Sequence, residues 1–470
     1  MRRLTLALVI IVVVAATAKA IALRTSVNDD ISATAKAIAL RTSEQGPQYP
    51  DPTQRVLTHR EQNAIVTPWI KKRFDTVLAP IMAREGIDMW IMPTREYNED
   101  PVFASMSPLT YYASRRRTIL VFYNPGGPST SLRAGGPVER YSVGRFDYDG
   151  IYTLVPTHND AQYEGLRKLV DEKNPKVIGI NESDAWQHAD GITANEKRRL
   201  VEALGPHASK IKSAEMLAVG WLEVKIPEEL EAYRHTMKVA HMVIREAFSN
   251  KVITPGKTTN EDVAWWMRQR VEELGLGKWF QPSVTIWRQG AKTNPRGAIL
   301  PGDMLHTDFG IVYLGLSTDT QHNAYVLKPG ETDAPAGLKA GLKAGNRLQD
   351  LTMQFARLER TGNQALTDAL AQAKKEGIVP SIYCHPVGYH GHGAGPPIGM
   401  TDYQQGVPVR GDYVFRPNTW HSIELNVTHN VPEWGGQAVR FALEEDAAIM
   451  PGGKWDWIDG RQETFYLIKP

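Results

Sequence analysis

The chain has 470 residues, enough for two or three domains, and its apolar content of 42% permits large hydrophobic cores. Its 54 Lys and Arg residues nearly balance 52 Asp and Glu residues, so the sequence lacks the basic excess that a nucleic-acid partner requires. The single cysteine, Cys384, excludes an intramolecular disulfide.

The N-terminus has the features of a bacterial secretory signal. Arg2 and Arg3 precede the apolar run 4–16, and Ala18-Lys19-Ala20 has an A-x-A cleavage pattern. The run is shorter than the ~20 residues of a membrane-spanning helix. We therefore expect residues 1–20 to be a signal peptide that is removed, leaving a secreted or periplasmic protein without stable membrane insertion. An uncleaved signal that anchors the chain in a membrane is the alternative.

An exact duplication follows the signal. Residues 16–26 and 33–43 both read A-T-A-K-A-I-A-L-R-T-S. A recent tandem duplication or a misplaced start site would explain such identity better than a fold would. We therefore assign 21–50 to a linker with a duplicated segment.

Residues 51–225 predict a small α/β domain. Helical spacing of apolar residues occurs at 66–85 and 161–172, and buried-strand patterns occur at 87–92, 118–123 and 177–180. Pro68 suits the first turn of the first helix, and Gly86 suits its end. Alternating helices and strands imply one α/β layer.

Three consecutive arginines, Arg115, Arg116 and Arg117, lie in this region. A solvated basic turn before a strand is the simpler interpretation. A role in binding a substrate carboxylate, or in contact between subunits, is the alternative.

Residues 226–470 predict a second, larger α/β (α+β) domain. Helices are expected at 227–249, after a capping box formed by Thr259 and Asp262, at 348–358 and at 365–375, with a strand at 284–287. The A-G-L-K-A repeat within 336–344 is expected to be a loop that enters a helix.

The stretch 304–319 predicts a β-hairpin that carries Asp308 and Asp319. A hairpin symmetric about Tyr313 and Leu314 would place the two aspartates opposite each other, with Cβ atoms ~5 Å apart. Carboxylates that close repel each other unless positive charge lies between them. Metal ions ~3.5–4 Å apart would fit between them. The alternative is one aspartate in the turn and one in solvent.

Three downstream stretches supply further candidate ligands. G-H-G-A-G contains His392, H-S-I-E-L-N-V contains Glu424, and V-R-F-A-L-E-E-D contains Glu444. Taken singly, a histidine of this kind is more often structural and a strand glutamate more often faces water. The five residues in this order are harder to obtain by chance.

In these motifs the sequence resembles the pita-bread metallopeptidases, namely methionine aminopeptidase, prolidase, aminopeptidase P and the metal-free creatinase. The resemblance covers about 226 to the C-terminus. The two-domain layout resembles the prolidase and aminopeptidase P branch, so it implies a pita-bread C-terminal domain (226–470) after a creatinase-like N-terminal domain (51–225). It also implies a homo-oligomer.

The resemblance implies that Asp308 binds one metal ion, His392 and Glu424 bind another, and Asp319 and Glu444 bridge both. Four carboxylates and one imidazole suit Mn(II), which we expect, or Co(II) or Fe(II), better than a closed structural zinc site; Zn(II) stays open. Two cations would generate hydroxide from a shared water, and Glu424 would be the catalytic proton shuttle.

The sequence departs from this pattern at substrate-binding positions. The family has a histidine seven residues after the ligand histidine, where this chain has Gly399, and a second histidine upstream of the hairpin, where only Trp287 and Arg288 are candidates. Aminopeptidase P has an arginine two residues before the last glutamate, and this chain has Ala442 at that position. Arg440 could supply the charge instead. Candidate substitutes for the imidazoles are His390, His421 and His429. Of all these we name Arg440, His390 and His429 as candidate substrate-binding residues.

We therefore expect a dinuclear metallopeptidase that cleaves between an N-terminal residue and proline, acting on a peptide with proline at its second position. The absent histidines motivate an alternative, a hydrolase of a non-peptide amide or ester on the same metal centre. A non-catalytic binding protein of this fold is a further alternative.

Overall fold

The computed structural model describes residues 49–126, 137–158 and 161–470. Residues 52–470 form one compact unit. The expected signal peptide and the duplicated segment lie outside the described residues, and the division between residues 225 and 226 stays a prediction. Across the described ranges, no helix is long and apolar enough to cross a membrane.

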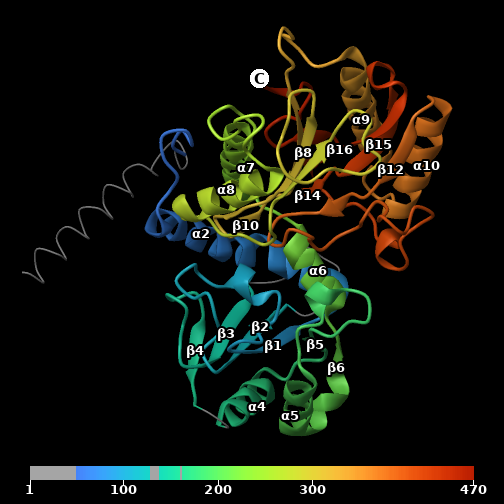
Figure 1. The fold of residues 1–470 in the computed structure, drawn as a ribbon. Coiled ribbons are helices and arrows are strands. Elements are labelled where there is room, and N and C mark those ends of the chain that lie inside the picture. Colours follow the sequence, from blue (N-terminus) through green and yellow to red (C-terminus); the bar gives the residue numbers. More distant parts are fainter. Residues whose placement is uncertain (1–48, 127–136, 159–160) are drawn as a thin grey trace, which may run out of the picture. The chain divides into compact units, whose positions relative to one another are not determined.

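The first sheet has six strands in the order β4-β3-β2-β1-β5-β6. They are β1 (Met89–Arg95), β2 (Arg117–Tyr123), β3 (Glu139–Gly144), β4 (Thr153–Pro156), β5 (Ile178–Ile180) and β6 (Ile211–Ser213). Helices α4 (Ala161–Lys173) and α5 (Ala194–Leu204) lie along one face (Figure 1). Leu166 and Leu200 of these helices share a core with Ile91 and Ile119 of the sheet. The predicted α/β layer is confirmed.

The first helix begins earlier than predicted. α2 (His59–Arg73) starts at a capping box between Thr58 and Glu61, continues through the π-helical segment Phe74–Leu78, and ends as α3 (Ala79–Glu85). Pro68 is therefore inside the helix, not in its first turn. Gly86 ends it as expected, with φ of 61°.

Five α-helices and four sheets form most of the rest of the described chain. The helices are α6 (Glu215–Glu223), α7 (Pro227–Ala247), α8 (Asn260–Glu273), α9 (Ala336–Phe355) and α10 (Gly362–Lys375). The sheets are β19-β11-β8-β7, β12-β15-β16, β13-β14-β17-β18 and the short β10-β9. Figure 1 shows α7 and α8 close to β8 and β10, and α9 and α10 beside β12 and β15.

The strands of these sheets are β7 (Ser283–Trp287), β8 (Met304–Phe309), β9 (Val312–Tyr313), β10 (Leu316–Ser317), β11 (Thr320–Val326), β12 (Val379–Ile382), β13 (His385–Pro386), β14 (Thr419–Ser422), β15 (Leu425–Val431), β16 (Gln437–Leu443), β17 (Asp446–Ile449), β18 (Trp455–Trp457) and β19 (Tyr466–Ile468). The predicted capping box of Thr259 and Asp262 is confirmed at the start of α8.

The predicted hairpin is present, but the predicted register differs from the observed one by two residues. Leu316 lies opposite Tyr313, so Leu314 and Gly315 form the turn, with φ of 57° and 72°. Two successive positive φ values are typical of a type I′ turn, which matches the twist of the strands it connects. Asp308 therefore lies opposite Gln321, not opposite Asp319.

The A-G-L-K-A repeat is helix, not the predicted loop. Gly337, Gly341 and Gly345 are one turn apart in α9; Gly337 faces Pro432 and Glu433, whereas Gly341 and Gly345 face the strand that leads to Glu444. A Cβ at Gly341 would lie 2.2 Å from the Phe441 ring, and one at Gly345 2.3 Å from Leu443. These glycines are thus required for close packing of α9 on β16.

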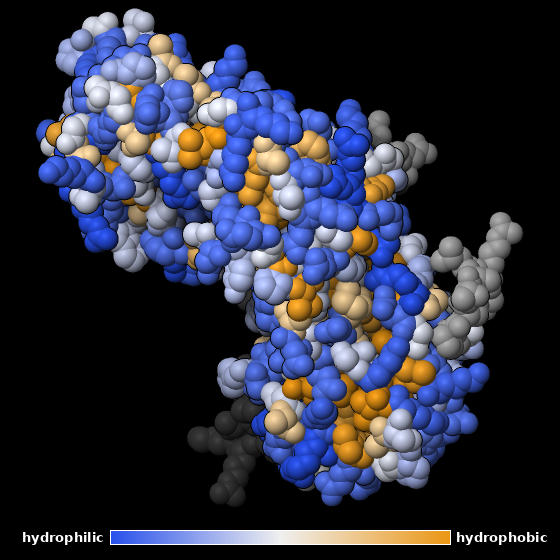
Figure 2. All heavy atoms as spheres, turned by 90° about the vertical axis from the view of Figure 1, so that its right-hand side faces the viewer, coloured by the Kyte–Doolittle hydropathy of each residue, from blue (hydrophilic) through white to orange (hydrophobic). Residues whose placement is uncertain are grey.

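Polar side chains dominate the surface. Figure 2 shows one face of the molecule on which hydrophilic residues prevail and apolar ones lie between them. Trp90, Trp221 and Trp420 are instead among the largest fully buried side chains.

Candidate metal centre

Four carboxylates that the sequence analysis identified come together in the structure. We call Asp308, Asp319, Glu424 and Glu444 the acidic cluster. Ligand atoms of Asp308, Asp319 and Glu444 lie within 4.8 Å of one another, as do those of His385, Glu424 and Glu444. The cluster draws on β8, on the residue before β11, and on residues beside β15 and β16.

Neutral side chains hold the two glutamates in place. The Gln321 amide donates to Glu424 Oε1 at 2.8 Å and to Glu444 Oε2 at 2.9 Å. The Ser422 hydroxyl donates to Glu444 Oε1 at 2.6 Å. His306 Nε2 lies 3.0 Å from Gln321 Oε1, so it fixes which end of the amide faces the glutamates.

The carboxylates of the cluster are crowded and largely enclosed. Burial raises the pKa of Asp308 to about 8, and the charge of Glu444 adds to the rise. Burial and Glu444 also raise the pKa of Asp319 and of Glu424 well above the usual range. Carboxylates so close together are stable in their charged form only beside cations.

The structure adds a histidine that sequence reasoning missed. His385 Nε2 lies 3.3 Å from Glu444 Oε1, 3.4 Å from Asp319 Oδ2 and 3.8 Å from Glu424 Oε2. The predicted ligand His392 is also close, because its ligand atom groups with those of Asp319 and His385. His385 is 4% exposed, whereas His392 is an exposed residue.

Several ligand atoms in the cluster have no partner. Asp308 Oδ1, Asp319 Oδ1 and His385 Nε2 are buried and make no hydrogen bond to the described residues. Buried polar atoms of this kind are rare in folded proteins unless a water or an ion binds them. Carboxylate oxygens and imidazole nitrogens are also the atoms that Mn(II), Fe(II) and Co(II) prefer. The residues present therefore fit a divalent metal centre.

A pocket opens beside the two histidines. Its lining residues are Gln187, Tyr383, His385, Pro386, His392, Gly393, Gly395, Pro397, Met400 and Arg410. The Arg410 guanidinium donates only to Gln187 Oε1 at 3.3 Å and to Met400 Sδ at 3.6 Å, and no ion pair involves it within the described chain. Val409, before it, has φ of 60°, which is a strained conformation for a β-branched residue.

The three candidate substrate-binding residues are placed differently from one another. Arg440 is exposed on β16, opposite Thr428, and lies close enough to Asp308 to interact with it electrostatically. His390 Nε2 instead lies 3.1 Å from the Pro101 carbonyl. His429 points to the other face of β15, where its ring lies 6.3 Å from Phe441.

The other positions considered for the missing family histidines have structural roles. A Cβ at Gly399 would lie 2.4 Å from the Ile382 carbonyl oxygen, so no histidine fits there. Arg288 pairs with Asp303 through two contacts of 2.7 Å and is not free for substrate. His421 Nε2 lies 3.0 Å from the Pro396 carbonyl and is structural.

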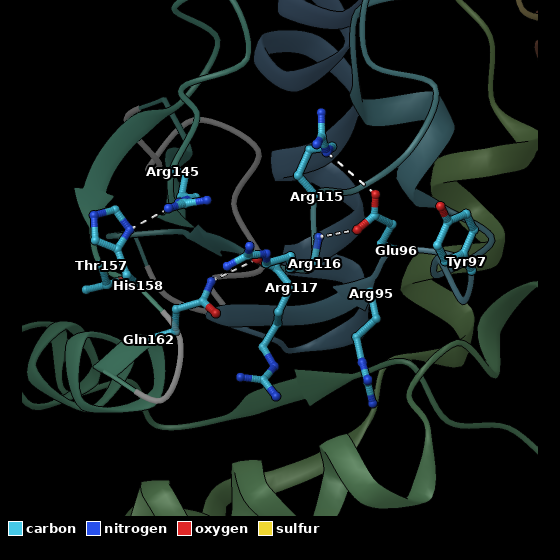
Figure 3. A pocket seen from close by; sticks show the side chains of 10 residues that line it. All are labelled: Arg95, Glu96, Tyr97, Arg115, Arg116, Arg117, Arg145, Thr157, His158 and Gln162. Carbon is cyan, nitrogen blue, oxygen red and sulfur yellow. Dashed lines mark hydrogen bonds and ion pairs between the residues drawn. The ribbon is translucent and has the colours of Figure 1, made fainter.

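The three consecutive arginines lie apart from the acidic cluster. They line a pocket on the first sheet with Arg95, Arg145 and His158 (Figure 3). Figure 3 shows Arg115 directed opposite to Arg95 and Arg117. Arg117 is paired with Glu196, at 2.8 and 3.2 Å, so it is structural.

Comparison with known proteins gives the fold. No family model and no curated protein matches the sequence. The chain is similar in structure to the X-Pro aminopeptidase of Thermotoga maritima, with a TM-score of 0.59, 16% identity, and coverage of 82% of this chain and 99% of that chain. The Xaa-Pro dipeptidase of Bacillus anthracis matches with a TM-score of 0.53, 15% identity, and coverage of 87% and 100%. The prolidase of Pyrococcus furiosus matches with a TM-score of 0.51, 15% identity, and coverage of 82% and 98%. The chain therefore has the pita-bread fold, as predicted.

Proposed function

We propose that this protein is a dinuclear metallo-exopeptidase that hydrolyses the bond between an N-terminal residue and proline. The observation that carries the proposal is the convergence of four carboxylates and two imidazoles with buried, unpartnered ligand atoms. The fold is shared with aminopeptidases and dipeptidases, so it supports this reaction class but does not choose between them.

In this proposal His385 is the histidine ligand and His392 has a different role. The family pattern has a second histidine seven residues after the ligand. Counted from His385, that residue is His392, so His392 would take the place that the sequence analysis assigned to Gly399. His392 lines the pocket, and its ring centroid lies 4.6 Å from that of His385. It is thus placed to donate a hydrogen bond to the substrate.

Asp308, Asp319, His385, Glu424 and Glu444 would hold two divalent cations, which we expect to be Mn(II). Such cations supply an activated water and polarise the scissile carbonyl. Glu424 is only partly enclosed, with 16% of its side chain exposed, so it can take a proton from the water and deliver it to the leaving nitrogen. Gln321 holds that carboxylate in position through its 2.8 Å hydrogen bond.

Arg410 favours a dipeptide substrate. Its guanidinium lines the same pocket as His392 and lacks a carboxylate partner within the described residues. A substrate carboxylate one residue beyond the scissile bond would supply that partner as a charge-assisted hydrogen bond. The reaction is therefore closer to that of a dipeptidase than to that of an aminopeptidase for long peptides.

The test is hydrolysis of Ala-Pro, Ala-Pro-amide and Ala-Pro-Ala, followed by mass spectrometry, with Mn(II) and with a chelator. We expect metal-dependent cleavage of Ala-Pro, and slower cleavage of the amide. Arg410→Met should remove that preference. Asp308→Asn should lower the rate ~10²–10⁴-fold. Cleavage of none of the three by metal-loaded protein would refute the proposal and favour the non-peptide hydrolase.

Export through the N-terminal signal and assembly into a homo-oligomer are part of the proposal. Both rest on sequence reasoning alone.

A further inference from the structure

A second cluster of candidate metal ligands is buried behind the acidic cluster. It consists of His241 on α7, His322 on β11 and Glu445 between β16 and β17. The three residues are 4%, 2% and 1% exposed. We call them the His-Glu cluster.

The His-Glu cluster lies on the opposite face of the strands that carry the proposed catalytic metals. Gln321 and Glu444 point to the acidic cluster, and the next residues along the chain are His322 and Glu445. Successive side chains of an extended chain point to opposite faces. The two clusters are therefore separate sites with no shared ligand.

Each of the two imidazoles directs its Nε2 atom at the Glu445 carboxylate. His241 Nε2 lies 3.0 Å from Glu445 Oε2, and His322 Nε2 lies 2.6 Å from Glu445 Oε1. The ring centroids are 5.0 Å apart. Ligand atoms bonded to one cation at 2.0–2.2 Å are separated by about 3 Å, so these contacts match the edges of a coordination shell.

The outer nitrogen of each imidazole is also held. His241 Nδ1 lies 3.0 Å from Asp459 Oδ2, and His322 Nδ1 lies 3.0 Å from the Tyr466 hydroxyl. The backbone N–H of Gln462 donates to Glu445 at 2.9 Å. Metal-binding histidines are typically oriented in this way, by a carboxylate or another polar group on the nitrogen remote from the metal.

We propose that His241, His322 and Glu445 bind one structural zinc ion, with Glu445 as a bidentate ligand. Two imidazoles and a carboxylate are a recurrent ligand set for zinc. The ion would join helix α7, strand β11 and the segment 445–466, all of which pack around the proposed catalytic centre. The alternative is a metal-free network in which the two histidines are hydrogen-bonded to Glu445.

The experiment separates this site from the acidic cluster. Asp308→Asn with Asp319→Asn weakens the acidic cluster and leaves the His-Glu cluster unchanged. After dialysis of this double variant against a mild chelator, elemental analysis should find about one zinc per chain. Adding His241→Gln and His322→Gln should remove it, while adding His429→Gln, a matched control elsewhere, should not.

Absence of zinc from the double variant, or its retention after both histidines are replaced, would overturn the proposal. If the histidine variants do not fold, X-ray absorption at the zinc edge decides the question in the double variant with His385→Ala and His392→Ala added, because the acidic cluster then has no imidazole beside it. Two imidazole nitrogens with carboxylate oxygen support the site, whereas a shell without imidazole contradicts it. Because activity is not the readout, failure of this proposal and failure of the peptidase proposal are distinguishable.

Discussion

His385 and His392 lie in one segment but differ in burial. His385 lies on β13 opposite Ser422, so strand pairing fixes it beside the hydroxyl that holds Glu444. His392 lies in the glycine-rich segment and reaches the pocket from its exposed side. We therefore propose the buried imidazole as the metal ligand and the exposed one as the substrate-binding group.

This difference predicts unequal effects of mutation. His385→Ala should weaken metal binding ~100-fold or more, because a ligand is lost. His392→Ala should lower kcat with little change in metal affinity. Titration calorimetry with Mn(II) and steady-state kinetics on Ala-Pro measure the two effects. The reverse result would restore His392 as the ligand.

The carboxylates of the site could be predicted from the sequence, but His385 could not. Asp308, Asp319, Glu424 and Glu444 lie in short patterns that local reading can recognise. The glycines around His392 made it the predicted metal ligand, because glycines allow the backbone to approach a ligand closely. The role of His385 depends on long-range pairing of β13 with β14, and the seven-residue spacing to His392 was its only local signal.

Asp100 gives a prediction about pH at the same scale. It is 2% exposed and accepts hydrogen bonds from Val102 N and from the Asn181 amide. Burial raises its pKa to about 7, above that of the unfolded chain. The folded state therefore holds the proton more tightly, so this stability is present at low pH and is lost as pH rises through about 7.

Relative to Asp100→Asn, which does not titrate, the wild-type chain should lose about 2–3 kcal/mol of unfolding free energy between pH 5 and pH 8. Urea unfolding of both proteins at the two pH values measures this. A difference that does not change with pH would show that the carboxyl is ionised throughout.

Among the elements, helix α9 positions the strand that ends at Glu444. Its glycines at 341 and 345 allow it to lie directly on β16. Gly341→Ala would force a Cβ into the Phe441 ring, so it should cost about 1–3 kcal/mol of stability. It should also lower activity beyond the loss of folded protein, because Glu444 would move.

Thermal unfolding and kinetics of Gly341→Ala test this, with Lys343→Ala on the exposed side of α9 as the control. The control should stay within ~0.5 kcal/mol of the wild-type chain. Equal stability and equal activity of the two variants would show that the close contact of Gly341 with Phe441 does not affect the free energy of unfolding.

Helix ends were predictable where a local signal exists, as at Thr259 and Asp262. The start of α2 was missed because Pro68 suggested a first turn, whereas the Thr58–Glu61 capping box sets the true start. The glycines of α9 suggested a loop when the sequence was considered alone. They are needed for tertiary contacts with Phe441 and Leu443, which no local pattern reveals. The predicted hairpin register was wrong because the turn was centred on Tyr313 and Leu314, one residue before the observed turn at Leu314 and Gly315.

At the scale of the whole molecule, a buried ion pair joins the first and second halves of the chain. Arg73 on α2 and Glu229 on α7 are both 0% exposed and meet at 2.9 Å. The Arg73 guanidinium also lies 4.3 Å from the Trp221 ring centroid. Removal of one charge would leave the other unpaired in the interior.

Glu229→Gln should therefore destabilise the protein by about 3–5 kcal/mol. Glu231→Gln, on an exposed position of the same helix, should have little effect. Denaturant unfolding of both variants compares them. A loss below ~1 kcal/mol for Glu229→Gln would mean that water or a rearranged neighbour replaces the carboxylate.

The turn of the hairpin that follows Asp308 is held by the start of the described chain. The Leu57 N–H donates to the Tyr313 hydroxyl at 2.7 Å, and the Leu314 N–H donates to Gln62 Oε1 at 3.4 Å. Cleavage at the expected signal site, or anywhere in the duplicated stretch, would leave these bonds intact. A protease that trims the mature chain beyond Gln62 would release the hairpin that carries Asp308. N-terminal trimming would thus lower activity without cutting any residue of the acidic cluster, and the lifetime of activity would depend on residues 57–62 staying attached.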